Sequence, residues 1–414
     1  MSNDTRPEIR FPGFTEDWEE RKLGDMMDVT SVKRIHQSDW TNSGIRFLRA
    51  RDIVSTAKNE EPSDYLYISE EKYNEYSKIS GKVSQGDLLV TGVGSIGVPL
   101  LITDDNPIYF KDGNIIWFKN EHKIDGNFFY YSFINNKIQK YIRDVAGIGT
   151  VGTYTIDSGK KTPISLPTYD EQIKIGSFFK QLDHTIALHQ RKLDLLKETK
   201  KGFLQKMFPK NGAKVPEIRF PGFTEDWEQR KLSELAEVKT GFPFKNDDFI
   251  DGGDYLVITN GNIQNNSALV DGNIGNRISA VSDEIKDKYL LNYGDILVTM
   301  DGTVGRTAKV FEKNQILAQR VGRLVANTTP EFLYQWLNTG KFFGDMTKVS
   351  HGGTIKHISL SEISDFNAFV PVNEDERVKI GSLLLNIDKT ITLHQRKLDL
   401  LKETKKGFLQ KMFV

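Results

Sequence analysis

The chain has 414 residues, and its 56 Lys and Arg balance 56 Asp and Glu, so the formal charge is zero. This length is enough for two or three domains with cores of their own. A hydrophobic content of 38% excludes a disordered chain. The absence of cysteine excludes disulfide frameworks, cysteine zinc sites and thiol nucleophiles.

No apolar run reaches the 18 residues that a membrane-spanning helix needs, and the mean hydropathy is -0.44. The first ten residues are polar and charged, without the apolar core of a secretory signal. We therefore expect no membrane association and a cytoplasmic location.

A mixed α/β domain is predicted after a short charged arm. The segment 45–53, IRFLRARDI, alternates apolar and polar residues as a strand does, and the stretches around 86–91 and 108–118 do the same. Apolar residues then recur at helical spacing from Phe129 to Ile142. The pattern predicts a β-rich domain with at least one helix.

A long helix is predicted from Glu171 to Phe208, because apolar residues recur there at alternating spacings of four and three. A continuous helix of these 38 residues would be on the order of 57 Å long. His189 and Lys200 are polar positions in its heptad seam. The apolar seam residues are Ile175, Phe179, Leu182, Ile186, Leu193 and Leu196.

The same series then recurs after a linker at 209–216. Residues 8–23, EIRFPGFTEDWEERKL, return at 217–232 with one change, and residues 186–208 return at 391–413 with one change. The second middle segment predicts strands near 255, 295 and 307 and a helix from 331. The second seam consists of Ile380, Leu384, Ile387, Ile391, Leu398 and Leu401.

The two long helices are predicted to pack on each other, because a lone helix would expose its apolar seam to water. An antiparallel pair with a pseudo-twofold axis is the arrangement we expect. His189 and His394 occupy matching seam positions and are interpreted as polar residues that set the helix register. Metal binding and pH switching are the alternatives.

The repeated ends are nearly identical, whereas the middles share little except one turn signature. That signature reads GDLLVTGVGSIG at 86–97 and GDILVTMDGTVG at 294–305. Neutral drift would spread changes evenly, so the ends are expected to have a common function and the middles two different ones. Recent recombination of the ends is the alternative explanation.

The sequence contains no phosphate loop, no GxSxG elbow and no HExxH pair. The GVGSIG run leads into an extended segment and predicts a tight turn between strands rather than a dinucleotide site. Asn106-Pro107-Ile108-Tyr109 is one residue short of the NPPY motif of adenine methyltransferases and is predicted to be a loop. Glu70-Glu71-Lys72 is interpreted as a solvated face rather than a nuclease site. No catalytic activity is expected from this chain.

These features together resemble the specificity subunit of type I restriction-modification enzymes. The likeness covers essentially the whole chain and is carried by the RFPGFxxxWE openings, the GD[LI]LVTxxG[ST][IV]G turns, and the DEQIKIGSFF and DERVKIGSLL segments that lead into the helices. It implies an α+β fold in which two mixed α/β target recognition domains are separated by two long antiparallel coiled-coil helices, with a pseudo-twofold internal repeat.

The resemblance also implies a function and a set of partners. Each recognition domain is expected to read one half of a bipartite, asymmetric target in double-stranded DNA. The helices are expected to set the spacer and to dock two methyltransferase subunits, through which two restriction subunits bind. No cofactor is expected on this chain, since S-adenosylmethionine, ATP and Mg are used by the partners.

Six segments are predicted along the chain. They are a conserved arm at 1–23, a target recognition domain at 24–169, a conserved helix and linker at 170–213, the repeated arm at 214–232, a second recognition domain at 233–371 and a conserved helix at 372–414.

The charge distribution departs from that of a simple DNA-binding protein. Residues 24–165 carry 17 basic against 18 acidic side chains, and residues 233–370 carry 13 against 17. Phosphate neutralisation drives sequence-independent affinity for DNA. The chain alone is therefore expected to bind DNA poorly, with partner subunits supplying much of the contact to the backbone.

Base recognition requires forked or hydroxyl-bearing side chains on loops. A surface role, a turn-stabilising role and phosphate contact are open alternatives for each candidate. In the first domain the candidates are Arg49, Arg51, Thr91, Ser95, Thr150 and Tyr154. In the second they are Lys245, Thr259, Asn260, Asn262, Gln264, Thr303, Arg306, Gln319, Arg320, His351, Thr354, Lys356 and His357.

Two other classes of protein remain open at this point. One is a non-catalytic coiled-coil scaffold whose domains bind proteins. The other is a detached recognition half of a fused methyltransferase-nuclease, which the second complete repeat disfavours.

Overall fold

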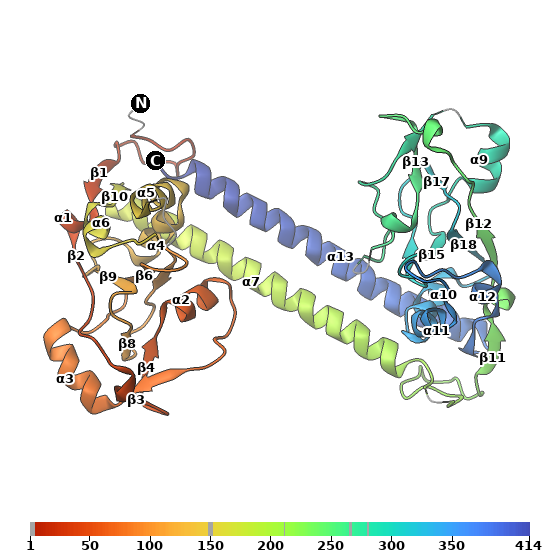
Figure 1. Cartoon of the computed structure of the whole chain (residues 1–414), viewed down its shortest axis with the longest axis horizontal. Coiled ribbons are helices and arrows are strands. Elements are labelled where there is room, and N and C mark those ends of the chain that lie inside the picture. The colour runs from red at the N-terminus through yellow and green to blue at the C-terminus, as the bar shows by residue number, and fades with distance from the viewer. Residues whose placement is uncertain (1–4, 148–151, 211, 265–266, 280) are drawn as a thin grey trace. The chain divides into compact units, whose positions relative to one another are not determined.

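The structure is a computed structural model that describes residues 5–147, 152–210, 212–264, 267–279 and 281–414 (Figure 1). The chain forms two compact units. The first contains residues 1–189 and 397–414, and the second contains residues 190–396. Each unit therefore includes part of both long helices.

The first unit contains ten strands and six short helices among its described residues. The strands are β1 (Glu19–Lys22), β2 (Asp28–Thr30), β3 (Trp40–Thr41), β4 (Ile45–Leu48), β5 (Leu66–Ile68), β6 (Leu88–Thr91), β7 (Pro99–Leu101), β8 (Ile108–Phe110), β9 (Ile115–Lys119) and β10 (Pro163–Leu166). The helices are α1 (Leu23–Met26), α2 (Ala50–Ala57), α3 (Glu70–Ser80), α4 (Gly126–Ile134), α5 (Asn136–Ala146) and α6 (Ile156–Lys161), with a 3-10 turn η1 (Gln37–Asp39).

The strands of the first unit form two four-stranded sheets, β2-β9-β6-β7 and β3-β5-β4-β8, and a two-stranded sheet, β1-β10. All pairs are antiparallel except β4 with β8. One apolar core lies against the first sheet and includes Ile175 and Phe179 of a long helix, so that helix is part of the domain core. A second core lies against the other sheet.

The second unit repeats this plan. Its strands are β11 (Glu228–Lys231), β12 (Ala236–Thr240), β13 (Tyr255–Ile258), β14 (Arg277–Ile278), β15 (Ile296–Thr299), β16 (Thr307–Lys309), β17 (Gln315–Leu317), β18 (Val321–Ala326) and β19 (Asn367–Val370). Its short helices are α8 (Leu232–Leu235), α9 (Asp283–Tyr289), α10 (Pro330–Leu337), α11 (Lys341–Val349) and α12 (Leu360–Asp365), with 3-10 turns η2 (Asn246–Asp248) and η3 (Asn260–Asn262). The sheets are β12-β18-β15-β16, β14-β13-β17 and β11-β19.

The two predicted long helices are present as α7 (Tyr169–Lys206) and α13 (Glu374–Lys411), each of 38 residues. Within the first unit the start of α7 and the end of α13 run antiparallel, since Phe178 contacts Phe408 and Asp183 pairs with Lys405. Six seam residues are fully buried and the other six are half-buried. The fully buried ones are Ile175, Phe179, Leu193, Ile380, Leu384 and Leu398.

Each conserved arm binds two helix ends. In the first unit Arg10 donates two hydrogen bonds of 2.7 Å to Glu171 near the start of α7, and the amide of Ile9 donates to the carbonyl of Lys411 at the end of α13. In the second unit Arg219 binds Glu376 at 2.7 and 2.8 Å near the start of α13. There the amide of Ile218 donates to the carbonyl of Lys206, the last residue of α7. The repeated arm and helix sequences thus contact each other.

Three expected elements have different boundaries in the structure. The predicted strand 45–53 is wrong beyond Leu48, because the Asp52 carboxylate accepts from the Arg49 amide and begins a helix there. The segment 108–118 is two strands rather than one. The predicted loop at 106–109 is wrong in part, since β8 begins at Ile108.

The continuous helical run predicted in each middle is a pair of helices. Asn135 has extended backbone angles, and its side chain caps the amide of Lys137, so α4 ends and α5 begins there. In the second unit Gly340 adopts a φ of +93° between α10 and α11. The GVGSIG run is a turn between strands β6 and β7, as predicted.

A glycine in each long helix allows the domain helix to approach closely. A methyl group added at Gly176 would lie 2.7 Å from the amide nitrogen of Phe128 at the start of α4, and one at Gly381 would lie 2.7 Å from the amide nitrogen of Phe332 in α10. Both distances are shorter than a Cβ contact permits. By contrast, Gly202 and Gly407 have open space around them.

Glycine-to-alanine substitutions at two positions of α7 should therefore change the stability of the protein in opposite directions. Gly202→Ala should raise the midpoint of urea denaturation, with a gain of about 1 kcal/mol in helix propensity. Gly176→Ala should lower the midpoint, because overpacking costs about 1–3 kcal/mol. Equal effects of the two substitutions on the midpoint would contradict the close packing of α4 on α7.

Candidate nucleic-acid interface

The turn after β15 has the same internal bonding as the turn after β6. The Thr299 hydroxyl donates to the carbonyl of Thr303 at 2.6 Å and accepts from the amide of Arg306 at 2.9 Å. Thr91 makes the equivalent bonds to the Ser95 carbonyl and the Val98 amide. Both hydroxyls thus form their hydrogen bonds inside the turn. This structural role explains why the two domains share the signature.

In the second unit a distant loop docks on this turn. The amide of Gly302 donates to the Lys356 carbonyl at 2.8 Å, and the amide of Ile358 donates to the Met300 carbonyl at 2.9 Å. His351 and His357 bond through their backbones, and their rings lie 4.0 Å apart. Residues 351–358 are thereby placed beside the turn.

Two further segments reach the same end of the sheet. The side chain of Asn260, which follows β13, accepts a hydrogen bond of 3.0 Å from the amide of Met300. Arg320, between β17 and β18, has a φ of +69° and points a guanidinium nitrogen to 3.4 Å from Asp301. Residues that are far apart in the sequence therefore gather at one end of the sheet.

Most of the thirteen candidates in the second unit are accessible. Asn262 is the exception, because it is buried and its side chain donates to the carbonyls of Asp271 and Ile274, so it stabilises the loop. Asn260, Arg306 and His357 are half-buried. The exposed candidates are Lys245, Thr259, Gln264, Thr303, Gln319, Arg320, His351, Thr354 and Lys356.

Arg306 has an incompletely satisfied guanidinium group. Its Nε atom is buried without a hydrogen-bond partner in the described part of the chain. Arg306 also lines a pocket of about 270 Å³ together with Gln264, Asn338 and Phe343. A buried donor without a partner costs free energy, so this position favours an acceptor from a bound molecule.

In the first unit two candidates are held by carboxylates. Arg49 donates hydrogen bonds to Asp52 and Asp64 at 2.8–3.0 Å. Burial lowers the pKa of Arg49, but these bonds and the two negative charges raise it overall. Arg51 pairs with Asp64 at 2.5 Å and is exposed. Both arginines are thus neutralised by their own domain.

The other candidates of the first unit divide by burial. Ser95 is exposed, whereas Thr91 and Tyr154 are buried at 0% and 2% exposure. The Tyr154 hydroxyl bonds to Thr162 in the core. The proposed interface therefore does not include the side chains of Thr91 and Tyr154. Thr150 lies outside the described residues.

Three basic residues at the corresponding end of the first unit were not among the predicted candidates. Lys33 and Arg34 follow β2, and Lys111 follows β8. Arg34 is 67% exposed and pairs with Asp112 at 2.8 Å. The run VKR follows the first sheet strand of its domain just as GFPFK does in the second, and this shared position is the signal that would have found them.

Within the described ranges, no group of three or more His, Cys, Asp or Glu side chains could hold a metal ion. Across the same residues, no helix is long and apolar enough to cross a membrane.

The fold is a duplicated α+β architecture in which each mixed domain packs on long helices. A family model described as the type I restriction modification DNA specificity domain matches residues 15–198 and 224–403. The chain therefore belongs to the family of type I restriction-modification specificity subunits and carries the DNA specificity domain twice.

Similar proteins agree with this assignment. The type I restriction enzyme MjaVIII specificity subunit of Methanocaldococcus jannaschii is 22% identical over 434 residues, which cover 97% of this chain and 92% of that protein. The S subunit of a type I restriction-modification system from M. genitalium has a TM-score of 0.64 at 14% identity, with 99% of both chains covered. A chain from a study of complex assembly in the type I system has a TM-score of 0.51 at 15% identity, covering 98% and 99% of the two chains. The last two likenesses show the shared fold.

The shared turn can be tested with a matched pair of threonines. Thr299→Val should destabilise the second unit by about 1–3 kcal/mol for each hydrogen-bonding group left unsatisfied. The amide of Arg306 should then exchange hydrogen faster in a mass-spectrometric exchange experiment. Thr303→Val, which replaces only an exposed hydroxyl group by a methyl group, should stay within about 0.5 kcal/mol of the parent. Equal protection of the Arg306 amide in all three proteins would refute this account of the turn.

Proposed function

We propose that each mixed domain reads one half of a bipartite, asymmetric target in double-stranded DNA, with domain boundaries at 24–169 and 233–371. The observation that carries the proposal is the gathering of accessible Thr, Gln, Arg and Lys side chains at one sheet end of the second unit. These are the side-chain types that bind base edges in the major groove and phosphates beside it.

The divergence of the loops supports two different half-targets. Arg49 of the first unit and Thr259 of the second occupy equivalent positions, since the amide of each donates to a buried side chain three residues later. Those partners, Asp52 and Asn262, are both almost fully buried. The two loops thus share one backbone hydrogen bond, while the side chains at their surfaces differ. This difference favours separate base recognition by each domain.

We also propose that the long helices set the spacer and dock two methyltransferase subunits, through which two restriction subunits bind. Exposed leucines recur at matching positions on both helices. Leu188 and Leu195 of α7 are 50% and 61% exposed, and Leu393 and Leu400 of α13 are 67% and 68% exposed. Residues seven apart lie on one face of a helix. A repeated apolar face is typical of a surface that binds the same partner twice.

The chain itself is proposed to be a non-catalytic subunit. Its membership in the specificity-subunit family supports this assignment, as it supports the expectation that S-adenosylmethionine, ATP and Mg act on the partner subunits. A coiled-coil scaffold without DNA specificity is disfavoured by the family match over both repeats.

Arg320→Gln tests the reading of DNA by the second unit. The substitution should weaken binding of the methyltransferase-containing complex to its target about tenfold, as expected for the loss of one base contact of 1–3 kcal/mol. Only one half of the methylated motif should become less specific. Fluorescence anisotropy at two salt concentrations and methylome sequencing measure the two effects.

Lys313→Gln is the matched control, because Lys313 is exposed in the turn between β16 and β17, at the opposite end of the sheet. It removes one positive charge and should leave both affinity and motif unchanged. Equal effects of the two substitutions, or altered specificity in both halves of the motif, would count against the proposed interface.

Leu195→Ser and Leu400→Ser test the docking surface. Each change removes an exposed apolar side chain whose burial stabilises a complex by about 1.5–3 kcal/mol. We expect each single variant to bind one methyltransferase subunit normally and the other about tenfold more weakly, and the double variant to weaken both. Native mass spectrometry at several subunit concentrations measures this. Unchanged binding of both subunits by the double variant would refute docking on these faces.

A further inference from the structure

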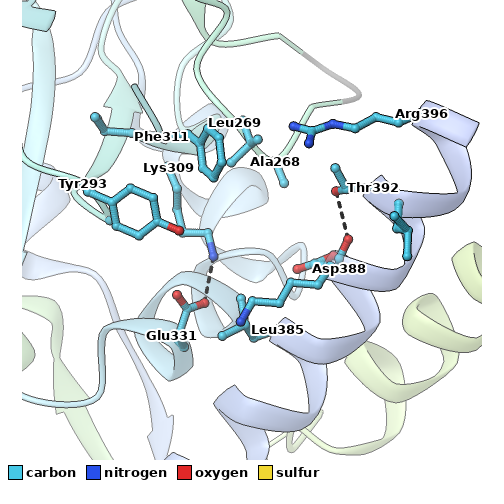
Figure 2. A pocket seen from close by; sticks show the side chains of 14 residues that line it. Ala268, Leu269, Tyr293, Lys309, Phe311, Glu331, Leu385, Asp388, Thr392 and Arg396 are labelled. Carbon is cyan, nitrogen blue, oxygen red and sulfur yellow. Dashed lines mark hydrogen bonds and ion pairs between the residues drawn. The ribbon is translucent and has the colours of Figure 1, made fainter. Parts of the chain in front are cut away.

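A pocket of about 510 Å³ in the second unit shares only Leu393 with the surfaces used by the proposed function (Figure 2). One wall is formed by Tyr293 and Phe311, and the facing wall by Leu385, Thr392 and Leu393 of α13. We call it the aromatic pocket. Tyr293 precedes β15 and Phe311 follows β16, so the pocket lies at the opposite end of these strands from the turn proposed to read DNA.

The walls of the aromatic pocket expose large apolar side chains. The rings of Tyr293 and Phe311 lie 5.5 Å apart, yet the two residues are 73% and 46% exposed. Leu393 on the facing helix is 67% exposed. Exposed aromatic and aliphatic side chains around a concave surface are typical of a protein-binding site.

The charges around the aromatic pocket favour an anionic occupant. The acidic residues are already paired, since Glu331 binds Lys309 at 2.7 Å and Asp388 binds Lys200 at 2.7 Å. Lys389 and Arg396 also line the pocket, and neither has a carboxylate within ion-pair distance in the described part of the chain. The pocket therefore combines an apolar interior with two cations that form no ion pair with any residue described in the structure.

The first unit lacks this pocket chemistry. Gln85 and Thr103 occupy the positions of Tyr293 and Phe311, and the Gln85 side chain donates to the Thr103 carbonyl at 3.0 Å. On the helix, Lys180 replaces Leu385 and His184 replaces Lys389. A surface that served both repeats would be expected to keep these residues, so the aromatic pocket serves something that binds once per chain.

We propose that the aromatic pocket binds an acidic peptide segment of a partner protein, one segment per chain. A large apolar side chain of the segment inserts between Phe311 and Leu385, and a neighbouring carboxylate pairs with Lys389 or Arg396. A peptide fits better than a small molecule, because Tyr293 and Leu393 are both largely exposed at the pocket walls, and an extended segment would cover more of their surface than a small ligand. DNA is disfavoured by the apolar walls and by the distance along the strands from the reading loops.

The experiment selects binders from a phage-displayed library of random twelve-residue peptides. The full chain is the target, and the Y293Q/F311T variant is used for counter-selection. This variant carries the residues that the first unit has at the same positions, where they are compatible with the fold. The expected peptides are rich in Asp and Glu and contain Trp, Phe or Leu.

Titration calorimetry of a recovered peptide should give one site per chain. The affinity should fall at least about tenfold in Y293Q/F311T, consistent with the loss of two aromatic contacts, and severalfold in Arg396→Gln. Gln85→Ala, which changes the equivalent wall of the first unit, is the matched control and should leave the affinity unchanged.

Several results would overturn the proposal. They are the recovery of no peptide that distinguishes the chain from Y293Q/F311T, the recovery of neutral or basic peptides, and two sites per chain. Binding of dodecanoate in the absence of any peptide binder would assign the pocket to small amphipathic anions instead. Loss of methyltransferase binding by Y293Q/F311T would place the pocket in the docking surface. Failure of the parent chain to bind methyltransferase would refute the docking proposal alone.

Discussion

One buried ion pair in each unit determines how the repeated sequences fit together. Glu171 is fully buried, and its charge is compensated by the two hydrogen bonds from Arg10. Removing one partner of a buried pair costs about 3–5 kcal/mol, so the arm must dock whenever the start of α7 is folded. Because the same arm binds the last turn of α13, it fastens the start of one long helix to the end of the other. Arg219 and Glu376 repeat this arrangement with the helices exchanged.

A second polar contact connects each recognition domain to the helices. Asp183 of α7 accepts from Lys405 of α13 at 2.6 Å and from the hydroxyl of Tyr131 in α4 at 2.7 Å. Burial and this hydrogen bond raise the pKa of Tyr131, so the phenol remains a donor. In the second unit Asp388 accepts from Lys200 and Gln335. The helix residues are conserved between the repeats while the domain residue has changed, so different domains are joined to the same helical frame.

The elements with a strong apolar periodicity could be predicted from the sequence. The elements whose start depends on a local capping hydrogen bond could not. The heptad seam is long enough to predict α7 and α13 to within two residues at each end. The helix α2 was missed, because its start depends on a hydrogen bond between Arg49 and Asp52 that an alternating pattern conceals. The candidate site was predicted in part. Side-chain type selected Arg320 and Lys356, which are accessible, but it did not distinguish them from Asn262 and Thr91, whose polar groups form hydrogen bonds inside loops.

The recognition domains carry no excess of basic residues, and several of their arginines are held by carboxylates of the same domain. Arg34, Arg49 and Arg320 each face a carboxylate of their own domain, which orders the side chain before any ligand binds. A phosphate or base must compete with that carboxylate, so a contact of this kind adds little sequence-independent affinity. It adds discrimination, because an incorrect base does not compensate for the lost ion pair. In the proposed function, weak binding to DNA in general and strict selection of a target would therefore have the same physical origin, and the partner subunits would supply the affinity that these domains lack.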